Sequence, residues 1–442
     1  MKTFTLQKNR TKFLSIILTA LLLSVFFKCT DNVEITRRYT VVEPEYLTIP
    51  ELRASFDIMP ADTLKKPGKI YLYENYIFVN EYGEGLHIID NTDPSNPKII
   101  QFINIPGNFD MAVKGDILYA DSYMDLVVLD ISNPQKITLL ERIENIFQNN
   151  NSDIPFDPER GVIIGWAEKE VVEVSSGDFN GNFPQYFYYG LKGIAMDMRF
   201  ANSAEVKTNF APAPSSTGIG GSMARFTIKG NHLYAIDRSN LHVFDISNLT
   251  LPIVGANLNV GWGIETIFPY KDNLFLGSQT GMHIYDISAP DYPIHLSTFA
   301  HIRSCDPVVV KDTIAFVTLR GGTVCRNDFT NQLDVLDISN LRDPILLTSY
   351  PMFNPHGLGV DGDLLFICDG KRGLVVYETN DLFKITENKI AEFTGIDAFD
   401  VIPFHNVLLM IGNEGLFQYD YSNPENIELL STLPVYRDEE LQ

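Results

Sequence analysis

One short pattern occurs seven times in this chain of 442 residues and restricts its possible folds more than any other feature. In each copy a turn residue precedes Leu or Met, and a run of mostly apolar residues then ends in an acid. The copies are Gly85–Asp90, Asp125–Asp130, Asn240–Asp245, Gly281–Asp286, Gln332–Asp337, Gly373–Glu378 and Gly415–Asp420. The acids lie 40, 115, 41, 51, 41 and 42 residues apart, which indicates a structural repeat of roughly 40 residues.

One repeat resolves into four short strands, as at 69–74, 76–81, 86–91 and 98–105. The first two strands are joined by tight turns such as Lys114-Gly-Asp116, which are typical of hairpins. Four antiparallel strands form a blade, and blades stacked in a ring cover each other's apolar faces. The sequence therefore predicts an all-β fold, a single β-propeller of seven four-stranded blades over residues 67–436.

The repeated acid is followed by a turn sequence such as Ile131-Ser-Asn-Pro134. An Asp at this place can accept hydrogen bonds from backbone N–H groups two or three residues further on. We therefore expect the seven acids to be architectural rather than catalytic or metal-binding.

The element Leu126-Val-Val-Leu-Asp130, with the Ile-Ser-Asn-Pro sequence after it, resembles the LVIVD repeat of bacterial and archaeal surface propellers. The likeness extends over roughly residues 67–436. It implies a propeller, but the family has no defined activity, so the resemblance supplies no catalytic residue.

Two intervals depart from the repeat. The 51-residue step predicts an insertion in the fifth blade between Arg320 and Leu333, and the 115-residue step predicts one after the second blade, at about 144–222. Within the latter, Gly161–Gly165 and Val171–Val174 predict a hairpin, and 175–222 predicts a long surface loop. A degenerate eighth blade is the alternative.

Residues 29–66 form an N-terminal lead-in or tether that contains several prolines. We expect the segment Arg53–Ile58 to be a strand that pairs with the last blade, because a propeller needs its ends tied together to avoid an open edge.

The first 28 residues contain five basic residues, no acid, and an uncharged, largely apolar run from Phe13 to Phe27. This pattern predicts a secretory signal peptide over 1–28, too short for a comfortable membrane span. Cys29 and the polar residues after it resemble a bacterial lipoprotein signal, which implies lipidation of Cys29. Ordinary cleavage nearby is the alternative, because Lys28 stands where such signals usually have a small residue.

We accordingly expect an exported chain, lipid-anchored in the bacterial cell envelope at the outer membrane, periplasmic or surface-facing. Its only membrane contact would be the lipidated N-terminus. Without the five basic residues of the signal, 29 basic residues remain against 56 acidic ones. This balance disfavours nucleic acid as a partner.

Repeat geometry places the turns between strands one and two, and between strands three and four, on one face of the propeller. The opposite face, where propellers most often bind ligands, holds the segments 108–110, 262–265, 303–306, 354–356 and 397–400. The candidate ligand-binding residues there are Asp110, Glu265, Asp306, His356 and Asp400.

No cofactor or catalytic metal is predicted from these residues, although calcium is a possible ligand because a ring of acids can supply oxygen atoms. No Asp-x-Asp-x-Asp loop supports it. The other histidines, His87, His242 and His283, fall inside third strands, where packing is the expected role.

Two cysteines flank the hairpin of the fifth blade. Cys305 stands at the open end of its first strand, and Cys325 lies just past its second strand, so both belong to the same face. Because an exported protein meets an oxidising environment, we expect a Cys305–Cys325 disulfide. Cys368 is predicted to be a buried free thiol.

The sequence has no Gly-rich phosphate loop, no Gly-x-Ser-x-Gly elbow and no Cys-x-x-Cys pair. It therefore favours a non-enzymatic interaction module that holds an envelope protein or glycan. The alternative is an extracellular hydrolase or lyase that acts on carbohydrate at the acidic channel mouth, with His356 and nearby Asp residues as acid and base.

Overall fold

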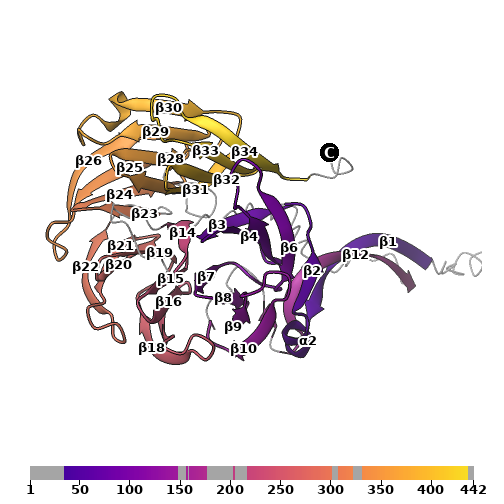
Figure 1. Cartoon of the computed structure of the whole chain (residues 1–442). Coiled ribbons are helices and arrows are strands. Elements are labelled where there is room, and N and C mark those ends of the chain that lie inside the picture. Colours follow the sequence, from indigo (N-terminus) through magenta and orange to yellow (C-terminus); the bar gives the residue numbers. More distant parts are fainter. Residues whose placement is uncertain are drawn as a thin grey trace, which may run out of the picture. The chain divides into compact units, whose positions relative to one another are not determined.

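A computed structural model of the chain describes residues 34–147, 156–157, 159–176, 203–204, 217–300, 307–321 and 331–436. The chain divides into two compact units, one of residues 1–46 with 163–195 and one of residues 47–162 with 196–442. The second unit contains a β-propeller. Its described strands form seven antiparallel blades, each with four strands in sequence order (Figure 1).

Blades 1 and 2 precede the long insertion, and blade 3 follows it. Blade 1 is β3 (Pro67–Tyr73), β4 (Tyr76–Glu81), β5 (Gly85–Asp90) and β6 (Lys98–Asn104); blade 2 is β7 (Met111–Lys114), β8 (Ile117–Ser122), β9 (Asp125–Asp130) and β10 (Thr138–Ile143); blade 3 is β15 (Phe226–Lys229), β16 (His232–Ile236), β17 (Asn240–Asp245) and β18 (Ile253–Asn259).

The other four blades follow without a break in order. Blade 4 is β19 (Ile264–Tyr270), β20 (Asn273–Ser278), β21 (Gly281–Asp286) and β22 (Ile294–Ala300); blade 5 is β23 (Val308–Lys311), β24 (Ile314–Leu319), β25 (Gln332–Asp337) and β26 (Ile345–Pro351); blade 6 is β27 (Leu358–Asp361), β28 (Leu364–Cys368), β29 (Leu374–Glu378), the 3-10 helix η1 (Ile385–Glu387) and β30 (Lys389–Phe393); blade 7 is β31 (Ala398–Phe404), β32 (Val407–Gly412), β33 (Gly415–Asp420) and β34 (Glu428–Pro434).

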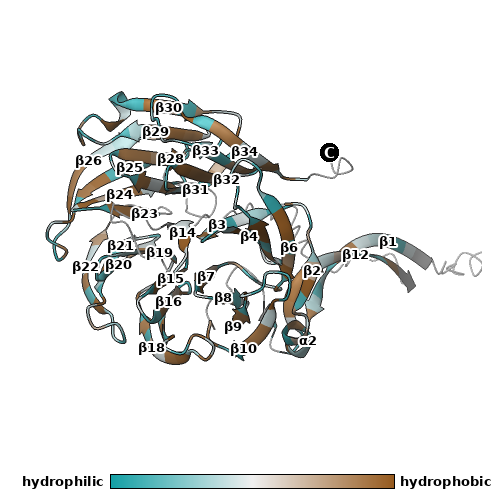
Figure 2. Cartoon of the chain, viewed as in Figure 1, coloured by the Kyte–Doolittle hydropathy of each residue, from teal (hydrophilic) through white to brown (hydrophobic). Residues whose placement is uncertain are grey.

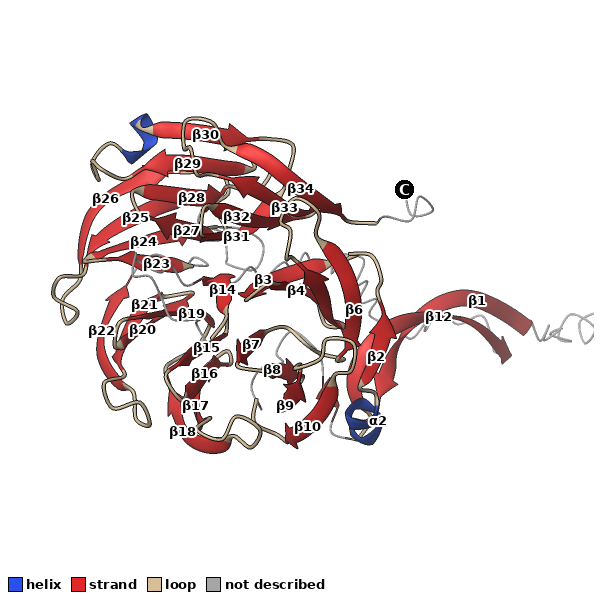
Figure 3. Ribbon diagram, viewed as in Figure 1, coloured by secondary structure: helices blue, strands red, loops and turns tan. Residues whose placement is uncertain are grey.

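The seven blades form a closed ring around their first strands (Figure 3). Each first strand contacts the first strand of the next blade, in the order β3, β7, β15, β19, β23, β27 and β31, and β31 contacts β3 again. The all-β fold class and the seven four-stranded blades predicted from the sequence are thereby confirmed.

Apolar side chains pack between the blades, which is why Figure 2 shows brown strands within each blade. The Leu or Met that opens each repeated pattern is buried in all seven blades. Burying such a side chain contributes roughly 1.5–3 kcal/mol. Each copy of the repeat thus contributes one such buried side chain to the stability of the ring.

Six of the seven repeated acids accept a hydrogen bond from the backbone N–H two residues further on, as predicted. The acids are Asp90, Asp130, Asp245, Asp286, Asp337 and Asp420. Side-chain and backbone hydrogen bonds at this turn lower the pKa of each. The seventh, Glu378, has a different local arrangement, in which its backbone N–H donates to the carbonyl of Asn388, near η1.

The lead-in closes the ring differently from our prediction. Arg53 lies in a short helix, α2 (Ile49–Ala54), and the strand β2 (Asp57–Pro60) pairs with β6 on the outside of blade 1. The link to the last blade comes from Leu64, which forms a parallel bridge with Val435. The cause is a capping box between Thr48 and Glu51 with Pro50 in the first turn, a helix signal that the sequence analysis missed.

The helix α2 packs on blade 2 rather than on the last blade. Leu52 is fully buried in a cluster with Tyr123 and Met124. Arg53 Nε lies 2.9 Å from a carboxylate oxygen of the buried Asp125.

In the insertion, the predicted hairpin is instead one strand, β12 (Gly161–Ser176), which pairs with β1 (Glu34–Leu47) and, at its start, with β11 (Phe156–Asp157). The segment between the two apolar runs, Trp166–Glu170, has no turn residue and continues the strand. The boundaries at residues 28 and 66 remain predictions.

Most of the predicted surface loop at 175–222 lies outside the described residues, and its end forms a strand instead of a loop. Residues 219–222 form β14 (Ile219–Ser222), which pairs with β3 inside the ring and with β13 (Ser203–Ala204), and β14 also contacts β27 and β31 (Figure 1). Thr217 bridges Lys114, so this segment begins beside the end of β7. The interior of the ring is therefore filled by the chain itself next to these strands.

Cys368 is buried and free, as predicted. No helix in the described ranges is long and apolar enough to cross a membrane.

Candidate functional site

Four of the five predicted ligand-binding residues lie at the end of the blades where the first strands begin, which we call the mouth face. They are Asp110 before β7, Glu265 in β19, His356 before β27 and Asp400 in β31. The end that holds the acids of the repeated turns is the corner face. Asp306 lies outside the described residues, as do Cys29, Cys305 and Cys325.

Basic residues that the sequence analysis missed alternate with the acids of the mouth face. Four of the charged residues share one position, four residues before the last residue of a first strand. They are Lys69 for β3, Asp110 for β7, Arg225 for β15 and Asp400 for β31. They are therefore equivalent positions of blades 1, 2, 3 and 7, which are neighbours in the ring. Comparing the seven repeats at this position could have revealed the alternation from sequence.

Lys69 and Asp110 form a buried ion pair between blades 1 and 2. The Lys69 Nζ lies 3.0 Å from Asp110 Oδ2, and the side chains are 6% and 3% exposed. The Asp110 carboxylate also accepts the backbone N–H groups of Met111, Arg225 and Phe226. Burial lowers the pKa of Lys69 to about 8, and the charge of Asp110 opposes this shift.

A second buried acid, Asp121, lies beside this pair at the end of β8. Its Oδ1 accepts hydrogen bonds from the backbone of Phe109 at 2.7 Å, from the backbone of Asp110 at 2.9 Å and from the side-chain amide of Asn108 at 3.0 Å. Burial raises the pKa of Asp121 to about 6, although these hydrogen bonds favour the charged form.

Asp121→Asn is expected to remove part of the pH dependence of stability. Because the folded pKa of about 6 lies above the unfolded value of about 3.9, the folded state binds this proton more tightly and loses stability as the pH rises from about 4 to about 6. The loss is about 3 kcal/mol for this group. Urea unfolding at several pH values should show a flatter profile for the variant.

The matched control is Asp130→Asn on the corner face, where hydrogen bonds lower the pKa. That group contributes stability that is lost as the pH falls through its folded pKa, below about 4. Its substitution should leave the slope between pH 4 and pH 6 unchanged. An unchanged slope in Asp121→Asn would contradict the assignment.

Asp400 is enclosed where β14 passes through the ring. A Cβ atom on Gly221 would lie 2.0 Å from one of its carboxyl oxygens, and a Cβ atom on Gly357 would lie 2.5 Å from the other. Oδ1 accepts the backbone N–H of Val401 at 2.9 Å. Burial raises the pKa of Asp400 well above its usual range, so its neutral form is favoured.

Glu265 lies among several cationic groups and accepts a hydrogen bond from Gln279 at 2.8 Å. Burial raises the pKa of Glu265, and the positive charges of Arg320, Arg238 and Arg225 oppose the shift. All three arginine residues are partly exposed.

His356 is buried beside blade 5. Its Nε2 lies 3.0 Å from the Asn354 side-chain nitrogen and 3.4 Å from a guanidinium nitrogen of Arg320. Its backbone is held as well, because the N–H donates to Cys368 and the carbonyl accepts from Thr318. Arg320 thus links the Glu265 and His356 groups across blade 5.

Basic and acidic residues both occur on the mouth face. Lys69, Asp110, Arg225 and Asp400 hold equivalent positions of blades 1, 2, 3 and 7, whereas Glu265, Arg320 and His356 hold other positions in blades 4, 5 and 6. Among the described residues, no three His, Cys, Asp or Glu side chains gather as metal ligands. Binding a cation here would require the carboxylates to exchange their present partners.

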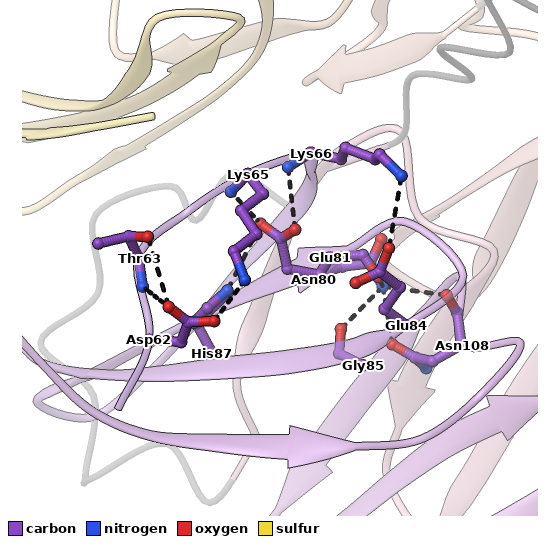
Figure 4. Close-up of polar contacts among 10 residues, drawn as sticks. All are labelled: Asp62, Thr63, Lys65, Lys66, Asn80, Glu81, Glu84, Gly85, His87 and Asn108. Carbon is purple, nitrogen blue, oxygen red and sulfur yellow. Dashed lines mark hydrogen bonds and ion pairs between the residues drawn. The ribbon is translucent and has the colours of Figure 1, made fainter. Parts of the chain in front are cut away.

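Polar contacts also fix the entry to blade 1 at the mouth face (Figure 4). The buried Glu81 carboxylate accepts the backbone N–H groups of Lys65 and Lys66 at 2.8 and 2.9 Å. His87 Nε2 lies 3.4 Å from Glu81, and its ring packs on Phe102 with centroids 4.8 Å apart. This group holds the segment that contains Leu64.

The third-strand histidines share one arrangement in addition to packing. Each imidazole ring contacts a residue at the end of the second strand of its blade or directly after it. His87 Nε2 lies near the Glu81 carboxylate, His242 Nε2 lies 2.9 Å from Asp237 Oδ2, and His283 Nε2 lies 3.2 Å from Ser278 Oγ. They are scaffold groups of the individual blades.

Two aromatic side chains of the mouth face project into solvent. Trp262 is 59% exposed and Phe353 is 60% exposed. Trp262 belongs to the loop before β19 that leads to Glu265, and Phe353 belongs to the loop before β27 that leads to His356. The mouth face therefore combines exposed aromatic rings with partly exposed polar groups.

Comparison with known proteins agrees with the repeat. The LVIVD repeat matches at residues 66–104, 109–144, 220–260 and 317–351, which correspond to blades 1, 2, 3 and the later part of blade 5. No curated protein matches the chain.

Three solved structures are similar to the chain at low identity. The computationally designed Ika8 protein is 8% identical, with 86% of this chain and 92% of that chain covered and a TM-score of 0.47. A functionally unknown protein from Desulfotomaculum acetoxidans is 12% identical (81% and 95% covered, TM-score 0.48), as is a protein from Lactobacillus plantarum (84% and 96% covered, TM-score 0.49).

Proposed function

We propose, from the premise that the chain is a seven-bladed propeller with LVIVD repeats, that it is a non-enzymatic binding module whose mouth face holds an envelope protein or glycan. We also propose that the chain is exported and lipid-anchored through Cys29. The basic N-terminal segment, the apolar run that follows it and Cys29 support the lipid anchor.

The observation that carries the proposal is that Trp262 and Phe353 are exposed on loops whose backbones are fixed by hydrogen bonds. The Phe353 and Asn354 backbone N–H groups donate to the buried Asp369 at 3.1 and 2.7 Å. A fixed loop that leaves a large aromatic ring in water gains stability when a partner covers that ring. Aromatic anchors of this kind contribute much of the energy of binding interfaces.

The hydrolase or lyase alternative needs an acid and a base that both reach a substrate. Asp110 and Asp400 are almost fully buried and make contacts within the protein instead. His356 is also buried and its imidazole lies between Asn354 and Arg320. These contacts favour a structural role for the acids over general acid–base chemistry.

A capture experiment with the full chain tests the binding proposal. Immobilised wild type is incubated with separated protein and glycan fractions of the bacterial envelope, beside the double variant Trp262→Ala and Phe353→Ala. We expect wild type to retain material from one fraction and the variant to retain at least about tenfold less. Tyr292→Ala is the control, because Tyr292 is 70% exposed in a turn of the corner face.

Two outcomes would contradict the proposal. One is equal retention by wild type and the double variant, with loss in Tyr292→Ala. The other is turnover of an envelope polysaccharide by wild type that His356→Ala abolishes while its fold is preserved.

A further inference from the structure

We propose that the ribbon formed by residues 36–46 of β1 and 163–172 of β12 lies on the surface of the membrane that holds the Cys29 anchor, with Trp166 at the lipid interface. This inference rests on the proposed lipid anchor and adds a membrane contact beyond the lipidated N-terminus. It depends on the exposed apolar face of the ribbon, on the short chain between Cys29 and β1, and on the nearly balanced charge of the ribbon.

The ribbon is a sheet of two strands among the described residues (Figure 1). β11 pairs with Gly161 and Val162 at the start of β12, and β1 pairs with β12 along the opposite edge. An isolated two-stranded ribbon is marginally stable in water, because it has too few strands to cover its own apolar side chains. A surface that covers one face of the ribbon would therefore stabilise it.

Two ion pairs between the strands show which side chains share a face. Lys169 Nζ lies 3.1 Å from Glu43 Oε2, and Arg38 Nη1 lies 3.9 Å from Glu170 Oε1. Because successive side chains of a strand point to opposite faces, the odd-numbered residues of both strands share one face and the even-numbered residues share the other. The large apolar residues of the even-numbered face are Val42, Ile164, Trp166 and Val172.

The even-numbered face leaves these four apolar side chains in water. Val42 is 56% exposed, Ile164 54%, Trp166 52% and Val172 51%. Single exposed apolar residues are common, but several on one face mark an interaction site. An indole beside aliphatic side chains suits the membrane interface, where its apolar body meets lipid and its N–H meets polar groups.

The short chain before the ribbon favours the membrane as the surface that covers this face. Cys29 precedes Glu34, the first residue of β1, by five residues. An extended chain spans at most about 3.6 Å per residue, so a lipidated Cys29 would hold the start of β1 within about 18 Å of the bilayer surface. Such a link makes the second contact effectively intramolecular, an advantage that a soluble partner lacks.

Charge determines which kind of lipid surface the ribbon fits. Its acids exceed its bases by one, and Glu43 and Glu170 are paired with bases. The acids are Glu43, Glu45, Glu168 and Glu170, and the bases are Arg37, Arg38 and Lys169. The ribbon therefore lacks the cluster of basic residues that draws a protein to anionic lipid. Its contact should depend on apolar side chains and form on zwitterionic lipid.

The test uses tryptophan emission, because Trp166 and Trp262 are the two tryptophans of the chain. Trp262→Phe leaves Trp166 as the single indole, and the lipidated full chain is reconstituted into phosphatidylcholine vesicles. We expect its emission to lie at shorter wavelength than that of the same chain with Cys29→Ser in buffer. Bromine-labelled phosphatidylcholine should quench it, because the indole has left water for the lipid interface.

Variants of the two faces provide the matched comparison. In the Trp262→Phe background, Val42→Ser with Ile164→Ser should shift the Trp166 emission back towards its position in buffer and reduce the quenching. Tyr39→Ser is the control, because Tyr39 is 38% exposed on the odd-numbered face. It should leave both signals unchanged. Adding phosphatidylglycerol to the vesicles should not increase the quenching.

The contrary outcomes distinguish failure of the inference from failure of the anchor. Lipidated Cys29 with Trp166 emission as in buffer would overturn the ribbon contact and leave the anchor intact. A shifted emission that bromine-labelled lipid does not quench would show that protein covers the ribbon, and quenching only with anionic lipid would contradict an apolar contact. Recovery of the chain without lipid on Cys29, shown by its mass, would overturn the anchor and the inference together.

Discussion

Replacing Asp110 with Ala is expected to lower the free energy of unfolding by about 3–5 kcal/mol, because it leaves the buried ammonium of Lys69 without its partner. The substitution also removes the acceptor of three backbone N–H groups, two of which come from the start of blade 3. Urea unfolding monitored by aromatic fluorescence would measure the loss. The effect is large because both side chains are almost fully buried.

Two further variants separate the ion pair from general damage. The double variant Lys69→Met and Asp110→Leu removes both charges and should be less destabilised than Asp110→Ala, since no unpaired charge remains. Asp130→Ala removes a partly exposed acid of the corner face and should cost only about 1 kcal/mol. A loss below about 1 kcal/mol for Asp110→Ala would contradict the buried pair.

Gly373→Ala is expected to destabilise the protein by about 3 kcal/mol or more, since the substitution combines overpacking with an unfavourable φ angle. Gly373 has φ of 91°, and a Cβ atom there would lie 1.8 Å from the backbone oxygen of Phe393 in the fourth strand. A backbone oxygen of a paired strand cannot move aside as a flexible side chain can. Chemical denaturation and the yield of folded protein would report the effect.

Gly362→Ala provides the matched control in the same blade. Gly362 also has a positive φ, of 54°, but a Cβ atom there would meet nothing within 4 Å. It should therefore cost only about 1 kcal/mol, the penalty of the backbone conformation. Equal losses at the two positions would show that close approach of the strands is not what selects glycine at the start of the third strand.

The propeller was predictable because each blade repeats the same local signals. The buried Leu or Met, the hairpin turn and the Asp corner recur at equivalent places, and each has the same physical cause in every blade. Errors arose where the chain departs from the repeat. In the lead-in, the residue pattern at 53–58 predicts a strand, whereas Thr48, Pro50 and Glu51 specify a helix start.

The interior strand β14 could not be foreseen from hydrophobic periodicity. Its glycines suggest a loop, yet Gly218, just before the strand, and Gly221, within it, are needed because β3 and Asp400 approach the backbone closely. Such glycine usage depends on neighbours that are distant in sequence.

The candidate site was predictable only in part. Sequence placed Asp110, Glu265, His356 and Asp400 at one end of the blades, because strand direction alone decides this. It did not reveal that Lys69 pairs with Asp110 or that three arginines lie near Glu265, since pairing across blades depends on the register of separate strands. The expected acidic mouth is therefore one of mixed charge among the described residues.

The central claim is that the mouth face binds the ligand, and hydrogen–deuterium exchange of the full chain with and without the envelope fraction that wild type retains tests it most directly. We predict slower exchange on binding in the loops that contain Trp262 and Phe353, with no change in the corner-face turn at 287–293. Slower exchange confined to the corner-face turns, with the two mouth-face loops unaffected, would contradict the account.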